Sequence, residues 1–145
     1  MKYLKALAIL SVFCVTFYSC TKEDDNKNVT GTTSPSDPRN VFIGTWVSNE
    51  DSQVFGTTTY SVDILAHSSI TNRIIVSNFY NLGFQASNCQ MEISGNSITI
   101  FQQNLSGYDV IGSGTLVNSS TINLSYTTND GAGIDSVSTV YTKTN

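Results

Sequence analysis

From residue 41 onward, apolar and polar residues alternate in short runs that are separated by Gly, Asn, Ser or Asp. The runs are rich in Val, Ile, Thr, Tyr and Phe and show no helical period, which is typical of β-strands with one buried face. The pattern predicts eight strands, at 42–49, 57–66, 70–80, 87–94, 97–103, 107–117, 120–128 and 134–143.

The predicted connections are a few residues long, so each strand can pair with the next as an antiparallel neighbour. Strands in such a meander close naturally into an up-and-down barrel, because closure removes both unpaired edges. A β-sandwich of Greek-key type is the alternative, but it needs a long connection that the pattern does not show. We therefore expect residues 41–145 to form an all-β domain, an eight-stranded antiparallel up-and-down barrel.

The alternation also predicts which side chains face the barrel interior. Gly112 and Gly114 fall on the inner face of the sixth strand and indicate a sharp bend or close packing there. The first and last strands are ambiguous, because apolar residues occupy both of their faces. The other predicted inward residues are Tyr60, Val62, Ile64, Ile74, Val76, Cys89, Met91, Ile93, Ile98, Ile100, Tyr108, Val110, Leu116, Ile122, Leu124 and Tyr126.

The N-terminal segment has the pattern of a secretory signal. Lys2 and Lys5 precede an apolar run that ends at Tyr18, and the small residue Ser19 follows. The run is shorter than the roughly 20 residues that a helix needs to cross a bilayer. We therefore interpret residues 1–19 as a signal peptide that is removed, not as a membrane anchor.

Cys20 comes directly after this segment, and Ser19-Cys20 resembles the lipobox of lipoproteins, although Phe17 and Tyr18 depart from its usual residues. The resemblance implies that the Cys20 thiol is acylated, for example with palmitate, and anchors the chain in a membrane. The alternative is an ordinary signal peptide that is cut nearby and leaves a soluble secreted domain.

The residues after Cys20 begin with a lysine and several acids. This stretch resembles the export signal of Bacteroidetes lipoproteins, which implies the outer face of the outer membrane; a solvated acidic patch is the alternative. Residues 20–40 are rich in Thr, Ser, Asn and Asp and contain both prolines, so we expect a flexible linker. The residues of the export signal are Lys22, Glu23, Asp24 and Asp25.

Charge and cysteine content exclude several classes of protein. Removal of residues 1–19 leaves five basic and eleven acidic residues, a net charge of about −6. Binding of nucleic acid needs clustered Lys and Arg, so we expect no nucleic-acid partner. Cys89 would then have no disulfide partner, and we interpret it as a small buried residue.

At the start of the first strand, Gly44-Thr45-Trp46 resembles the Gly-x-Trp signature of lipocalins and related calycins. The resemblance implies that Trp46 closes the barrel floor and packs against a basic residue of the last strand, for which Lys143 is suitably placed. The domain is smaller than a lipocalin and has no C-terminal helix. The domain is more similar to small lipocalin-like lipoproteins of Bacteroidetes, which share stretches like IGTW (43–46), RIIVSNFYNLG (73–83), SITIFQQ (97–103) and GSGTL (112–116). No activity is agreed for that family, so the resemblance bears on the fold and hardly on function.

Candidate catalytic groups are few. His67 falls in a turn between two strands, and Glu50 and Asp51 are expected in a loop, away from the other carboxylates. Asp130 and Asp135 could offer oxygens to calcium, but a hairpin turn is the better interpretation of 129–133. We expect no enzyme activity, no cofactor and no metal site.

Binding is the more defensible function, since an eight-stranded barrel can hold one small ligand. We expect a cell-surface binding module for a small apolar or glycan ligand. The alternative is a structural or interaction lipoprotein that contacts other envelope proteins, for which we expect an exposed apolar patch of Val41, Ile43, Val47, Phe79 and Phe101. The candidate ligand-lining residues are Trp46, Tyr60, Asn72, Asn78, Gln102, Tyr108 and Tyr126.

Overall fold

The structure is a computed structural model that describes residues 37–144. The predicted signal peptide, the lipidated Cys20, the export signal and the linker up to residue 36 lie outside the described residues. Within the described range, no helix is both long and apolar enough to span a membrane.

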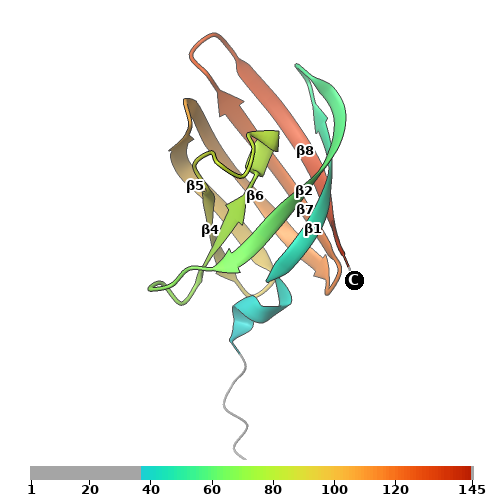
Figure 1. The fold of residues 1–145 in the computed structure, drawn as a ribbon, viewed down its shortest axis with the longest axis vertical. Helices are drawn as coiled ribbons and strands as arrows, with labels where there is room; N and C mark the ends of the chain where they lie inside the picture. The colour runs from blue at the N-terminus through green and yellow to red at the C-terminus, as the bar shows by residue number, and fades with distance from the viewer. Residues whose placement is uncertain (1–36, 145) are drawn as a thin grey trace, which may run out of the picture. The chain divides into compact units, whose positions relative to one another are not determined.

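Eight antiparallel strands form a closed barrel in which each strand pairs with the next and β8 pairs with β1 (Figure 1). The predicted up-and-down barrel is therefore confirmed, and the sandwich is excluded. The strands are β1 (Gly44–Ser52), β2 (Gly56–Ala66), β3 (Arg73–Ser77), β4 (Cys89–Ser94), β5 (Ser97–Leu105), β6 (Tyr108–Asn118), β7 (Thr121–Asn129) and β8 (Ile134–Lys143).

The predicted bounds differ from the observed ones by up to three residues at β1 and β3 and by at most two residues at the other strands. β3 is shorter than expected, because the chain leaves the sheet after Ser77 and folds into the barrel end. β1 continues past residue 49 to Ser52, because Glu50 pairs with Thr58 on β2 and with Thr139 on β8. Glu50 and Asp51 are thus strand residues rather than loop residues.

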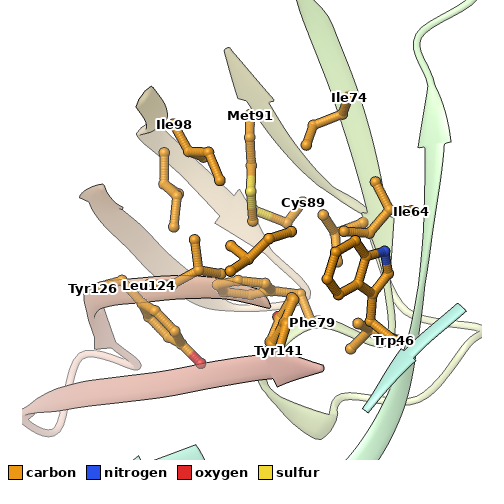
Figure 2. Close-up of a cluster of buried hydrophobic side chains, with 14 of the residues drawn as sticks. Trp46, Ile64, Ile74, Phe79, Cys89, Met91, Ile98, Leu124, Tyr126 and Tyr141 are labelled. Carbon is orange, nitrogen blue, oxygen red and sulfur yellow. The ribbon is translucent and has the colours of Figure 1, made fainter. Parts of the chain in front are cut away.

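The interior is filled by apolar side chains from every strand (Figure 2). All the inward positions predicted on β2, β3, β4, β6 and β7 are buried or half-buried, as are Ile98 and Ile100 on β5. The structure also resolves the two ambiguous strands. Their inward residues are Trp46, Ser48, Glu50 and Ser52 on β1, and Asp135, Val137, Thr139 and Tyr141 on β8.

One end of the barrel, here called the floor, is closed by η1 (Pro38–Val41), Phe42 and Trp46. Trp46 is fully buried and its Nε1 donates to the Phe42 carbonyl oxygen at 2.8 Å. Lys143 Nζ lies 5.1 Å from the centroid of the Trp46 ring and donates to the Val41 carbonyl oxygen at 2.9 Å. The predicted contact between tryptophan and the last strand is therefore present.

Arg39 connects η1 to the turn between β2 and β3 through hydrogen bonds. Its Nη1 donates to the carbonyl oxygens of His67 at 2.8 Å and Ile70 at 2.9 Å. Its Nη2 pairs with Asp37 at 2.6 Å, and the hydrogen bond from Arg39 lowers the pKa of Asp37 to about 2. Residues 37–40, which the sequence assigns to the linker, thus take part in closing the floor.

Gly112 and Gly114 pack directly against β7, as their inward position predicted. They pair with Tyr126 and Leu124 respectively. A Cβ atom at Gly112 would lie 2.6 Å from the Cα atom of Tyr126, and one at Gly114 would lie 2.5 Å from the carbonyl oxygen of Asn123. Only glycine allows this approach, so the two positions let large β7 side chains enter the barrel.

The opposite end, here called the mouth, is formed by the β1–β2, β3–β4, β5–β6 and β7–β8 connections (Figure 1). The β3–β4 connection folds inward there. Asn78, Tyr80 and Asn81 all have positive φ angles, of 59°, 55° and 53°. This turn, which contains η2 (Phe79–Asn81), buries Phe79 almost completely and leaves Tyr80 8% exposed. Left-handed backbone at three non-glycine residues is strained and is maintained by the surrounding contacts.

Candidate functional site

The mouth contains two hollows that share three aromatic side chains. One has a volume of about 260 Å³ and the other of about 330 Å³. Phe55, Tyr80 and Tyr108 line both of them, Asp135 lines the first and Glu50 the second. These volumes are at the lower limit of small-molecule sites, so the mouth suits a compact ligand.

Glu50 lies inside the barrel and is only 3% exposed. Its Oε2 accepts hydrogen bonds from the hydroxyl groups of both Tyr60 and Tyr126. Burial raises the pKa of Glu50, and the two tyrosine hydrogen bonds offset only part of this effect. The site therefore holds a carboxyl group that takes up a proton more readily than an ordinary glutamate.

Asp135 is the second inward carboxyl group, and its surroundings are different. Its Oδ2 accepts from Ser52 Oγ at 2.6 Å and from the Tyr80 hydroxyl at 2.7 Å, while its Oδ1 accepts from the Val54 amide at 3.1 Å. Burial by itself would raise the pKa of Asp135, but these donors together lower it. The structure thus places two carboxyl groups beneath the mouth, one with a raised pKa (Glu50) and one with a lowered pKa (Asp135).

Tyr80 joins the Asp135 contacts to the aromatic walls. Its ring makes edge contacts with Phe55, Tyr108 and Tyr126, at centroid distances of 6.2, 5.5 and 6.2 Å. Burial, followed by the contact with Asp135, raises the pKa of Tyr80 to about 12, so its hydroxyl stays protonated and donates. Phe79, its neighbour in the turn, packs on Tyr126 at 4.5 Å (Figure 2).

The predicted lining residues fall into separate groups. Tyr108 lines both hollows, and Tyr60 and Tyr126 contact Glu50 below them. Trp46 belongs to the floor, at the other end of the barrel. Asn78 serves the inward turn, because its amide donates to the Ser61 carbonyl oxygen and accepts from the Gly83 amide.

The expectation that Asn72 and Gln102 point inward is wrong, since both are exposed. Asn72 lies in the β2–β3 turn, outside the sheet. Gln102 lies at an irregularity in the pairing of β5 with β6 between Ile100 and Gln103, where an added residue reverses the alternation. Beyond that point Leu105 is the buried residue.

The sequence analysis missed Glu50, Asp135, Phe55 and Tyr80. A signal for Glu50 was present, because Trp46, Ser48, Glu50 and Ser52 share one phase of the alternation. Once Trp46 is placed inside, the same phase carries Glu50 inside as well. Phe55 and Tyr80 lie in connections, where no periodicity assigns a direction.

Of the remaining reactive groups, His67 and Cys89 do not line the hollows, whereas Asp130 lines the first of them. His67 is in the β2–β3 turn at the floor, where its Nδ1 accepts from the amides of Ser69 and Ile70. Burial raises the pKa of the Cys89 thiol, which disfavours the thiolate. Asp130 accepts from the Ala132 and Gly133 amides, as the hairpin interpretation predicted.

No protein-family model matches the sequence, and no curated protein matches it. Among solved structures, the chain is similar to a redesigned β-barrel, b11L5F_LGL, with a TM-score of 0.50 and 10% identity over 75% of this chain and 96% of that one. It is also similar to EF1p2_mFAP2b bound to DFHBI, with a TM-score of 0.53 and 10% identity over 74% of this chain and 98% of that one. At such identities the likeness shows the fold alone, which is a β-barrel.

Proposed function

We propose that this chain is a cell-surface lipoprotein whose barrel binds a small ligand at its mouth without transforming it. The observation that carries the binding proposal is the pair of adjoining hollows that share Phe55, Tyr80 and Tyr108 above two buried carboxyl groups. Apolar walls with a few fixed polar groups are the usual composition of a small-molecule site. The similar barrel that holds DFHBI supports the proposal at the level of the fold.

A non-catalytic role is favoured by the positions of the reactive groups. The described histidine lies at the floor, and the described cysteine is buried with a raised pKa. The carboxyl groups at the mouth are held by tyrosine, serine and backbone donors. These groups can orient a ligand through hydrogen bonds, which is what a binding module requires.

A titration of ligand against matched variants tests the binding proposal. Native mass spectrometry of the full chain identifies any copurified molecule, and calorimetry then measures its affinity. Phe55→Ala and Tyr108→Ala should weaken binding about tenfold each, because each removes one wall. Val117→Ala, an exposed apolar residue on β6 near the floor, is the control and should leave affinity unchanged. Equal affinities in all variants would place the ligand elsewhere and refute the proposal.

The anchoring part of the proposal rests on Cys20 and on the acidic stretch Lys22 to Asp25. Metabolic labelling with an alkynyl palmitate analogue should label the wild-type chain but not Cys20→Ser. Replacement of Glu23, Asp24 and Asp25 by alanine should retain the label but abolish digestion by protease added to intact cells. A labelled chain that stays protease-accessible after this replacement would refute the export role.

The alternative, contact with other envelope proteins, needs an exposed apolar surface. The patch expected from the sequence does not exist in that form, because Phe79 is buried and Arg73 lies 4.6 Å from the Phe101 ring centroid. Exposed apolar side chains are found at the mouth instead, at Val54, Phe55 and Ile134. They lie on the hollow itself, so we favour the ligand site over a separate protein interface.

A further inference from the structure

The three aromatic rings of the mouth stand at steep angles to one another. The Phe55 and Tyr80 ring planes meet at 62°, and those of Tyr80 and Tyr108 at 66°. Rings arranged edge to face present their faces in different directions, so together they form walls around a hollow rather than a stack. Phe55 is 65% exposed, so its ring is accessible to a ligand that enters the hollow.

The basic residues of the domain are confined to one end of the barrel, whereas acidic residues occur at both ends. Among residues 37–144, every Lys, Arg and His lies at the floor end: Arg39 in η1, His67 in the β2–β3 turn, Arg73 at the start of β3 and Lys143 at the end of β8. Within the same residues, the charged side chains at the mouth end are all acidic: Glu50, Asp51, Asp109, Asp130 and Asp135.

The basic residues at the floor are also committed to contacts there. Arg39 pairs with Asp37, Arg73 pairs with Glu92 at 2.5 Å, and Lys143 binds the Val41 carbonyl oxygen. No cation within residues 37–144 is therefore placed to neutralise Glu50 or Asp135. Buried carboxylates ordinarily have a cationic partner or a metal, so these two lack the partner that such groups usually have.

We infer that the mouth binds a compact organic cation, an ammonium group on a small apolar body, with Phe55, Tyr80 and Tyr108 around the cation and Glu50 and Asp135 as its counter-charges. The inference rests on the proposed binding function and adds the class of ligand. Aromatic faces attract ammonium groups through the negative potential of the ring, and desolvated carboxylates strengthen the attraction.

The shape of the interior argues against the other classes of ligand. A long acyl chain needs depth, but Trp46, Phe79 and Tyr141 are at most 1% exposed and fill the barrel below the mouth (Figure 2). An anion of any size would meet two buried carboxyl groups and no base. A neutral sugar would satisfy the hydrogen-bonding groups but leave the charges unpaired.

Three probes of one shape and different charge test the inference. Choline, its uncharged carbon isostere neohexyl alcohol and the anion tert-butylacetate are titrated against the full chain by calorimetry and by saturation-transfer NMR. We expect choline to bind at least about tenfold more tightly than the alcohol, and the anion not to bind. This comparison needs no variant and is independent of any folding defect.

Variants then locate the cation. Glu50→Gln and Asp135→Asn, each checked for a cooperative thermal transition, should weaken choline binding about tenfold while affecting the alcohol little. Asp51→Asn removes the same charge from the outer face of β1 and should leave the affinity for choline nearly unchanged. An equal loss in Asp51→Asn would mean that only the general negative field attracts choline, which would overturn the assignment to the mouth.

The outcomes separate this inference from the proposed function. If the alcohol or the anion binds as tightly as choline, and Phe55→Ala weakens both, the cation inference fails and the binding function stands. If none of the three probes binds at millimolar concentration and the full chain copurifies with no small molecule, both fail.

Discussion

Replacement of Gly112 by alanine should destabilise the barrel strongly. The added Cβ would lie closer than 3.0 Å to the carbonyl oxygen of Ser125 and 2.6 Å from the Cα atom of Tyr126. These atoms belong to the backbone of β7, so they cannot move aside by a change of rotamer. Overpacking of this kind costs about 1–3 kcal/mol.

The loss of stability in Gly112→Ala should exceed the small stabilisation that alanine gives by restricting the unfolded chain. Exchange of glycine for alanine reduces the freedom of the unfolded chain, which by itself stabilises a protein by about 0.4–1 kcal/mol. Gly133→Ala isolates this contribution, because a Cβ at Gly133 has no atom within 4 Å and the backbone there has no positive φ. We expect Gly133→Ala to be neutral or slightly stabilising and Gly112→Ala to lower stability by about 2 kcal/mol.

The assay is urea unfolding of both variants followed by circular dichroism, with thermal unfolding as a second measure. A loss of about 2 kcal/mol corresponds to a decrease in Tm on the order of 10 °C for a domain of this size. Tyr126 also bonds Glu50, so displacement of β7 at this point should shift the tyrosine ring signals in NMR spectra. A Gly112→Ala chain as stable as Gly133→Ala would show that β6 and β7 separate easily, and the packing argument would be wrong.

Substitutions at three further positions, Glu50, Asp135 and Lys143, test the polar groups. Because burial raises the pKa of Glu50 above 4.5, the folded state binds the Glu50 proton more tightly than the unfolded state does. The stability of the wild type should therefore fall as pH rises above 4.5, and Glu50→Gln should reduce this fall in urea titrations from pH 4 to 8. Asp135→Asn should cost about 1–3 kcal/mol at neutral pH, because both carboxylate oxygens of Asp135 accept hydrogen bonds and the NH₂ group of asparagine would face one of these donors. The lowered pKa of Asp135 means that the wild type should also lose this stabilisation as pH falls below 3.8, which acid unfolding measures. Lys143→Met should cost about 1 kcal/mol and alter Trp46 fluorescence, whereas Lys143→Arg should retain most of the stability, and no change in either variant would refute the contact.

The sequence predicted those features that depend on periodicity. Alternation placed Val62, Met91 and Leu124 inside, and the inward glycines of β6 indicated close packing where Gly112 meets β7. The resemblance of Gly44-Thr45-Trp46 to the calycin signature predicted the floor and its contact with Lys143, because these positions are fixed by strand register.

The mouth could not be predicted in the same way, because its side chains depend on backbone departures. Tyr80 enters the barrel because the positive φ angles of Asn78, Tyr80 and Asn81 turn the chain inward, and no alternation encodes such a turn. Gln102 was misplaced because an added residue in β5 reverses the inward and outward alternation, and the sequence pattern does not show where such a residue is inserted. Glu50 was misplaced because the first strand was predicted to end at residue 49, although Ser48, Glu50 and Ser52 continue the inward phase of Trp46.

The polar groups inside the barrel lie near its mouth, apart from the apolar side chains that stabilise the fold. The lower interior is packed with apolar side chains, and a barrel selected for stability alone would continue that packing to the mouth. Instead, β1 and β8 turn Glu50 and Asp135 inward with no base nearby, and the raised pKa of Glu50 shows that its charged form is disfavoured there. A buried carboxyl group whose charged form is disfavoured, as at Glu50, is typical of a functional site, and so is the strained, aromatic-lined hollow beside it. The same two carboxyl groups therefore give the strongest reason to search for the ligand at the mouth.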